Sequence, residues 1–279
     1  MRPTAVFTLF AALSALSVRP ADMELEERDE TADRLFGFVR NEFKNGHTML
    51  GTLKATRPRW VLEGQAGWRT GELGRFWGGV WNASDFTKGY ADERRMWLNE
   101  MDAYLGYGYT YGISEGWALD SKIEWMWTEL RYTHTPHTFY QWILTETLQT
   151  PWVDAYWFLW AYAHPYWGPA HCVGLKKDVP VWGDFSVEPN FFLDMGSSQW
   201  NRRRYGHWTA DEAHYRAGPT AANLAITLNY RPSPNWRFYF GVQQYDLIAG
   251  EPRRQKRAQH ARNARQDYTF FVVGVMWIF

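Results

Sequence analysis

Long segments in which apolar and polar residues strictly alternate are the feature that most constrains the fold of this chain. In residues 117–128 (WALDSKIEWMWT), one face carries five large apolar side chains, and the other carries two carboxylates, a lysine and a threonine. The same period of two recurs in residues 185–195, 222–230 and 236–243. Because successive side chains of a strand point to opposite faces, these segments are predicted to be β-strands with one apolar face.

The composition indicates where such strands would lie. Aromatic residues make up 18% of the 279 residues, yet the mean hydropathy is −0.50. After residue 20, no apolar run reaches the roughly 18 residues that a membrane-spanning helix requires. A transmembrane β-barrel reconciles these observations, because only every second residue of its strands meets lipid and because Trp and Tyr suit the membrane interface. A soluble periplasmic β-sandwich, with its tryptophans inside, is the alternative, since sandwich strands also alternate.

We predict an all-β fold, a transmembrane antiparallel up-and-down barrel of twelve strands, with ten strands as the alternative if residues 139–163 are misassigned. The predicted strands are 46–56, 58–70, 74–86, 97–111, 116–129, 139–148, 151–163, 167–179, 184–196, 219–231, 234–247 and 267–279. Bacterial barrels have an even strand number, short periplasmic turns and longer external loops. If the last strand runs toward the periplasm, the long links 197–218 and 248–266 are external, and most short links are periplasmic.

The N-terminal region is predicted to be separate from the barrel. Arg2 precedes an apolar stretch over residues 4–18, and Ala15-Leu16-Ser17 offers a small-x-small cleavage site, so residues 1–17 are predicted to be a secretory signal peptide. Residues 18–45 are charged and are expected to form a periplasmic segment, either a partly ordered tail or a short helix over residues 31–43. The barrel is then expected to span residues 46–279.

The last ten residues, FFVVGVMWIF, alternate to the final position. This strand resembles the C-terminal signature of bacterial outer-membrane barrels, which implies recognition by the barrel-assembly machinery. The residues that carry this signature are Gly274, Trp277 and Phe279. Such a strand also closes the barrel, so that no unpaired edge remains in lipid.

A second resemblance involves residues 77–86 (WGGVWNASDF) and 98–112 (LNEMDAYLGYGYTYG). An aromatic and glycine-rich strand ends in a small polar turn, and an acidic strand rich in Gly and Tyr follows. This pattern resembles a family of porins described as TorF-type or Gcw proteins. The resemblance implies an outer-membrane barrel with a transport role.

Polar residues on the second face of each strand are predicted to line the lumen, because ionised groups facing hydrocarbon are costly. The predicted lining residues are Glu63, Glu100, Asp102, Tyr104, Asp120, Lys122, Glu124, Asp154, Glu188, Asp194 and Arg237. In one interpretation, an acidic constriction in a water-filled pore prefers cations or polar solutes. In the other, the charges pair across a narrow lumen and plug it.

Basic residues concentrate in the predicted external loops, although Lys and Arg together number 30, as do Asp and Glu. These loop residues are Arg202, Arg203, Arg204, Arg253, Arg254, Lys256, Arg257, Arg262 and Arg265. Guanidinium groups bind phosphate in bidentate fashion, so the loops are candidates for docking on lipopolysaccharide or for recruiting anionic solutes. A solvated basic loop without a partner is the alternative. The balanced charge gives no reason to expect nucleic-acid binding.

Motifs for catalysis or metal binding are scarce. The single cysteine excludes an intramolecular disulfide and a Cys-based metal site, and no cofactor or metal is predicted. Ser114 lies in a Gly-x-Ser-x-Gly pattern, but a strand is predicted after it where a nucleophile elbow needs a helix. We therefore expect passive diffusion of small polar solutes or ions through an outer-membrane barrel. A lipid-modifying enzyme with a scattered Ser/His/acid triad and a plugged structural or adhesion barrel remain alternatives.

Overall fold

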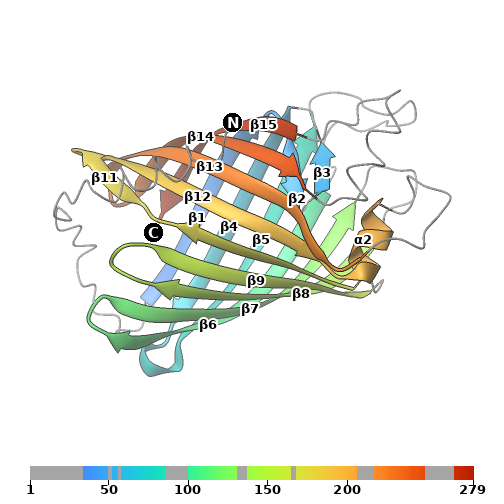
Figure 1. Ribbon diagram of the computed structural model, residues 1–279. Coiled ribbons are helices and arrows are strands. Elements are labelled where there is room, and N and C mark those ends of the chain that lie inside the picture. The colour runs from blue at the N-terminus through green and yellow to red at the C-terminus, as the bar shows by residue number, and fades with distance from the viewer. Residues whose placement is uncertain are drawn as a thin grey trace.

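The computed structural model describes residues 34–49, 52–55, 58–85, 100–130, 137–164, 168–205, 216–248 and 267–279. Its main sheet is antiparallel, and it closes on itself because β10 pairs with β12 while β15 pairs with β1 (Figure 1). The ring contains twelve strands. They are β1 (Arg34–Lys44), β4 (Arg59–Arg69), β5 (Arg75–Asp85), β6 (Glu100–Ser114), β7 (Trp117–Leu130), β8 (His137–Gln149), β9 (Asp154–His164), β10 (Pro169–Lys176), β12 (Phe185–Gly196), β13 (Gly218–Ser233), β14 (Trp236–Leu247) and β15 (Asp267–Ile278).

The remaining described elements are short and lie at the two ends of the barrel. β11 (Val179–Trp182) pairs with β12 beyond the end of β10, and the 3-10 helix η1 (Gly71–Leu73) lies in the link between β4 and β5. β2 (His47–Met49) and β3 (Thr52–Ala55) form a separate two-stranded sheet. Helix α2 (Ser198–Tyr205) follows β12. Among the described residues, no helix is long and apolar enough to cross a membrane.

The twelve-strand count is confirmed, but the first strand was predicted in the wrong place. β1 occupies residues 34–44, where we expected a tail or a short helix, whereas residues 46–56 contribute only the small β2–β3 hairpin. The spacing of Leu35, Phe36, Val39 and Phe43 resembles a helical face, and this misled the prediction. The segment is a strand because β15 and β4 bind it on both sides, and these partners lie far away in sequence.

The predicted alternation of short and long links is confirmed. One end of the barrel carries short links such as residues 115–116, 183–184 and 234–235. The other end carries the β2–β3 hairpin and α2 (Figure 1). The start of β1 and Phe279 meet at the short-link end, where the backbone amides and carbonyls of Gly37 and Phe279 bond to each other at 2.9 and 3.0 Å.

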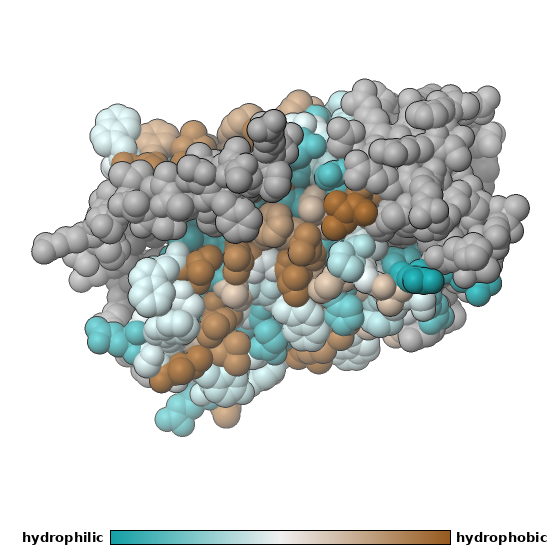
Figure 2. All heavy atoms as spheres, viewed as in Figure 1, coloured by the Kyte–Doolittle hydropathy of each residue, from teal (hydrophilic) through white to brown (hydrophobic). Residues whose placement is uncertain are grey.

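The outer face of the wall is apolar. Alternate residues expose large hydrophobic side chains, including Leu105 at 64% and Val80 at 62%, and Figure 2 shows such residues spread over the visible wall. A β-sandwich would bury its tryptophans between two sheets, whereas five tryptophans of the ring occupy outward positions in the strand register. They are Trp68, Trp117, Trp127, Trp236 and Trp277. The soluble β-sandwich alternative is therefore wrong.

Candidate functional site

The inward face of the barrel carries all eleven residues predicted to line the lumen. The register places each of them on the face opposite to the exposed apolar side chains. For example, Asp102 and Tyr104 lie on the opposite face of β6 from the exposed Leu105, and Asp102 pairs with Thr128 across the strand boundary. The inward positions also bring in charged residues that the sequence analysis missed, above all Arg40 and Glu42 of β1.

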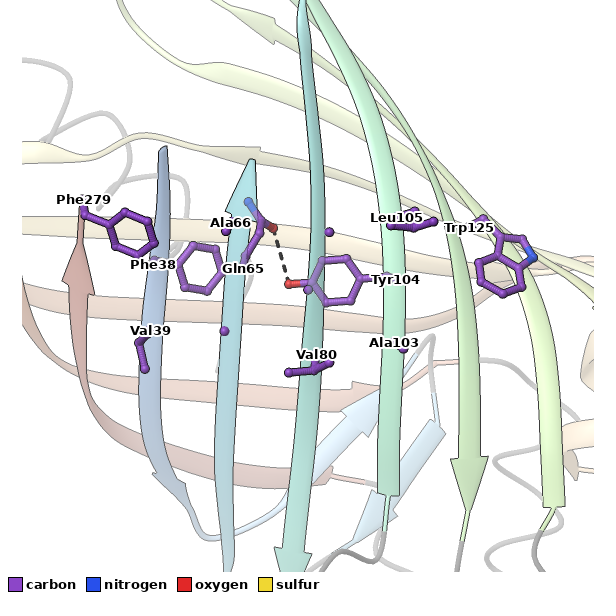
Figure 3. Close-up of a pocket in the computed structure, with 13 residues that line it drawn as sticks. Phe38, Val39, Gln65, Ala66, Val80, Ala103, Tyr104, Leu105, Trp125 and Phe279 are labelled. Carbon is purple, nitrogen blue, oxygen red and sulfur yellow. Dashed lines mark hydrogen bonds between the residues drawn. The ribbon is translucent and has the colours of Figure 1, made fainter. Parts of the chain in front are cut away.

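The first cluster lies midway along β1, β4 and β6. The guanidinium of Arg40 forms an ion pair with Glu63, and the Tyr104 hydroxyl donates to the same carboxylate at 2.8 Å. Tyr104 reaches across the intervening strand β5, and Figure 3 shows its hydroxyl directed toward Gln65, at 3.4 Å. The ion pair and the hydrogen bond together connect Glu63 of β4 to β1 and to β6.

The second cluster surrounds Glu42 of β1, whose carboxylate has three partners. Glu42 is 4% exposed and accepts from the Tyr239 hydroxyl at 2.5 Å. The ammonium of Lys44 lies 2.8 Å from it, and the guanidinium of Arg40 lies 3.2 Å from it. Because β1 was not predicted as a strand, this cluster could not be found from the sequence.

A third cluster lies nearer the short-link end of the lumen. Asp120 pairs with Arg75 and, at 3.1 Å, with Lys122, and it also accepts from the Thr110 hydroxyl at 2.9 Å. Glu124, four residues after Asp120 on β7, accepts from the Trp77 indole at 2.9 Å. The predicted acidic residues of β7 thus have donor partners and do not form an open ring of carboxylates.

Other predicted lining residues lie nearer the two ends. At the long-link end, Glu100 pairs with the buried Arg59 at 3.4 Å, and Asp194 accepts from the Asn223 amide at 2.9 Å. At the short-link end, the Lys177 ammonium lies 3.3 Å from Asp154.

The last two predicted residues lie on the arc from β12 to β14. Arg237 donates to Asn229 at 2.9 Å, and Glu188 lies opposite Thr227 in the register. Charged and polar groups therefore follow the inside of the barrel from one end to the other.

Glycines at inward positions let aromatic side chains lie flat against the wall. A Cβ added at Gly79, Gly106, Gly174 or Gly274 would come within 3.0 Å of the ring of Tyr104, Trp77, Tyr156 or Tyr239, respectively. In each case, the aromatic residue stands on the neighbouring strand and its polar tip bonds to a strand beyond the glycine. Glycine inside a strand commonly marks such a close approach. This recurrence was the sequence signal available for the missed tyrosines.

The wall itself is thin beside the first cluster. On the outward face, Gly64 and Gly78 carry no side chain, and they border a shallow apolar groove of about 640 Å³ that Val80 and Leu105 also line (Figure 3). Most of its lining residues point outward, and the inward residues Gln65 and Tyr104 of the first cluster also border it.

The basic residues predicted in external loops are only partly placed. Arg202 is exposed in α2, and the backbones of Arg203 and Arg204 belong to the same helix at the long-link end. The other six, Arg253, Arg254, Lys256, Arg257, Arg262 and Arg265, lie outside the described residues, as do residues 1–17 of the predicted signal peptide.

The described residues contain one Ser–acid pair on the outer face but no assembled triad. Ser121 donates to Glu146 at 2.5 Å, whereas His171 stands three strands away on β10 and accepts from the Trp157 indole at 3.3 Å. Ser114 ends β6 beside a tight turn, as predicted. Within the described ranges, no group of three or more His, Cys, Asp or Glu residues could hold a metal ion.

The closed ring, the apolar outer face and the charged inner face define a membrane-spanning β-barrel. A closed barrel satisfies every backbone group of the spanning strands, and this architecture is typical of the bacterial outer membrane. The sequence analysis predicts the same location.

Comparison with known proteins gives similarity of fold only. No family model and no curated protein matches the chain, so the resemblance to TorF-type and Gcw porins stays a prediction. Among solved structures, the KdgM porin is 12% identical, with 88% of this chain and 99% of that chain covered and a TM-score of 0.48. The NanC porin is 13% identical, with 86% and 98% covered and a TM-score of 0.49. An outer-membrane channel from Pseudomonas putida F1 is 8% identical, with 89% and 96% covered and a TM-score of 0.48.

Proposed function

We propose that the chain is a porin-like channel through which small polar solutes or ions diffuse passively. The observation that carries this proposal is the partial exposure of charged side chains on the inward face of the barrel. The side chain of Arg40 is 27% exposed and that of Lys122 is 37% exposed, although both point into the lumen. Water that reaches these groups inside a membrane-spanning ring supports an aqueous path lined by charges.

The ion pairs of the lumen limit the expected charge selectivity. Asp120 is matched by Arg75 and Lys122, and Glu63 is matched by Arg40. Paired charges leave a weak net field, so we expect only a small preference for cations instead of the strong preference of a bare acidic constriction.

Single-channel conductance of the refolded protein in a planar bilayer under a salt gradient tests the proposal. We expect discrete current steps and a reversal potential displaced slightly toward that of cations. The double variant Asp120→Asn/Glu124→Gln removes two lumenal carboxylates and should displace the reversal potential toward anions. Trp142→Ala, which changes an exposed outward side chain on β8, is the matched control and should leave it unchanged.

A plugged structural barrel is the competing function, and it also has an observation in its favour. Tyr104 and Tyr239 are 5% and 9% exposed although they face inward, which shows that side chains crowd parts of the lumen. Insertion into the bilayer without conductance would contradict the channel and support the plugged barrel.

Two further partners belong to the same proposal. The basic external residues would dock on lipopolysaccharide phosphates through their guanidinium groups. Unchanged lipopolysaccharide binding after substitution of the six basic residues in 248–266 would contradict this docking. The C-terminal strand, with Gly274, Trp277 and Phe279, would be recognised by the barrel-assembly machinery.

A further inference from the structure

Strand β9 carries aromatic residues at four consecutive inward positions. These residues are Tyr156, Phe158, Trp160 and Tyr162. The ring centroids of Phe158 and Trp160 are 6.4 Å apart, and those of Trp160 and Tyr162 are 6.5 Å apart. Ring contacts join Phe158, Trp160 and Tyr162, and Tyr156 holds the next inward position. We refer to these four inward residues as the aromatic ladder.

The next strand leaves space beside this ladder. The inward positions of β10 that face the ladder hold Ala170, Cys172 and Gly174, which are all small. Tyr156 uses this space, because its ring lies over Gly174 and its hydroxyl donates to Asn190 on β12 at 2.9 Å. A ring that lies flat on the wall turns one face toward the lumen.

The ladder is covered by other side chains at the long-link end of the barrel. Its residues nearer the short-link end are partly exposed. Trp200 of α2 is fully buried, and its ring centroid lies 5.5 Å from that of Tyr162, which is 5% exposed. Trp160, Phe158 and Tyr156 keep intermediate exposure. Since these three rings face inward, their exposed surface opens into the lumen. The Lys176 ammonium lies 5.7 Å from the centroid of the Tyr156 ring, so Trp160 and Phe158 offer the surface that is available to a solute.

Hydrogen bonds hold the rings and place polar groups at their edges. The Trp160 indole donates to the Gln141 carbonyl oxygen at 2.7 Å, and the Gln141 amide donates to Thr128 at 2.6 Å. Asn190 lies beside Tyr156, and the pair of Lys177 and Asp154 lies at the end of the ladder that is nearer the short links. Pockets that combine aromatic surface with a few fixed polar groups are typical of specific ligand sites.

The opposite side of the lumen is charged. Around the closed ring, β9 lies six strands from β1 in either direction, so β1 is the strand farthest across the barrel. Its inward face carries Arg40, Glu42 and Lys44, and the two cations are matched by Glu42 and by Glu63 of β4 in the ion pairs described above. A solute between these walls would meet aromatic surface on one side and self-neutralised polar groups on the other.

We propose that the aromatic ladder of β9 is a binding track for uncharged saccharides. A sugar ring has a face of C–H groups, which packs on an aromatic ring, and an edge of hydroxyls, which bond to amides and ion pairs. Trp160 and Phe158 supply the flat surface, and Asn190 and the pair of Lys177 and Asp154 supply polar partners. Gln141 is 1% exposed and serves to hold the Trp160 ring. This assignment names the solute class of the channel and so rests on the proposed function.

The pairing of several lumenal cations with carboxylates favours uncharged over acidic sugars. Two other inward cations have different partners, since Lys176 lies over the Tyr156 ring and Arg237 donates to Asn229. Arg40, Lys44 and Lys177 each have a carboxylate as a close neighbour in the lumen. A solute carboxylate would have to displace that partner before it could bind, whereas a hydroxyl can join an existing pair.

Interruption of single-channel current by a neutral oligosaccharide tests the inference. Maltohexaose on one side of the bilayer should interrupt the current in proportion to its concentration, whereas polyethylene glycol of matched size should not produce resolved interruptions. Trp160→Ala should raise the half-blocking concentration roughly 3- to 10-fold, as expected for loss of one stacked ring. Trp160→Phe, which keeps a flat ring, should retain most of the block. Trp142→Ala, on the outward face of the neighbouring strand, should block like the unchanged protein.

The outcomes separate this inference from the channel itself. Absence of conductance would refute the channel and therefore also the binding track. Normal conductance with no block by maltohexaose, or with equal block in Trp160→Ala, would leave the channel standing and overturn the track. Stronger block by a hexuronate oligomer would assign the lumen to acidic sugars, and stronger block by choline would assign the rings to organic cations. Either of the last two results would also overturn the proposal.

Discussion

Replacement of Gly274 by alanine should destabilise the barrel far more than its single added methyl group suggests. A Cβ at this position would lie within 3.0 Å of the Tyr239 ring, so the ring would have to leave the wall. The Tyr239 hydroxyl would then lose its 2.5 Å bond to Glu42, which is 4% exposed. The affected contacts join β14 and β1 across the closing strand β15.

The magnitude follows from three effects. Loss of a hydrogen bond to a buried carboxylate costs about 1.5–3 kcal/mol. Forcing side chains out of a packed wall costs about 1–3 kcal/mol. Alanine recovers about 0.5–1 kcal/mol relative to glycine inside a strand, because it loses less backbone freedom on folding. The net loss in the free energy of unfolding should be about 2–5 kcal/mol.

Equilibrium unfolding by urea in lipid vesicles, followed by tryptophan fluorescence, measures this loss without the assembly machinery. Gly64→Ala is the matched control, because a Cβ there meets nothing within 4 Å and the free energy of unfolding should stay the same or rise slightly. Tyr239→Phe should be costly alone but nearly free in the Gly274→Ala background, where its hydroxyl bond is already lost. If Gly274→Ala and Gly64→Ala were equally stable, the ring-over-glycine reasoning would be refuted.

Two further predictions concern the two faces of the wall. Leu105→Arg places a charge at a 64% exposed outward position and should lower the free energy of unfolding in vesicles by about 2–4 kcal/mol. Thr227→Arg, which is inward and opposite Glu188, should lower it far less. Equal losses for the two variants would contradict the assignment of the faces. Cys172 faces the lumen but is 1% exposed, so a water-soluble thiol reagent should label it about 10-fold or more slowly than Lys122→Cys in a Cys172→Ala background. Rapid labelling of Cys172 would show that the lumen is wider beside β10 than the structure indicates.

The lumenal clusters could not be predicted from the sequence, although their members largely could. Alternation predicted Glu63, Asp120 and Glu124 to face the lumen, and the strand register sets them opposite to the exposed apolar face. Their partners depend on the register between strands and on contacts that skip a strand, as in the bond from Trp77 to Glu124. No local pattern encodes such contacts, because they form only when two strands are aligned through a third one.

The aromatic ladder shows the same division. The alternation of Tyr156, Phe158 and Trp160 is visible in the sequence, but both faces of β9 are apolar, since Trp157 and Leu159 occupy the outward positions. Only closure of the ring decides which face meets lipid. The space beside the ladder, which the small residues of β10 provide, likewise depends on the pairing of β9 with β10.

The sequence by itself determined the all-β class, the location of eleven of the twelve barrel strands, the alternation of short and long links and the face on which most charged residues lie. These properties follow from the period-two pattern and the turn spacing, which are local. The tertiary structure alone decided that residues 34–44 form β1, that glycines seat the tyrosine rings and that lumenal carboxylates are paired with bases. Each of these depends on which strands become neighbours when the sheet closes, and that choice is made by the free energy of the whole ring.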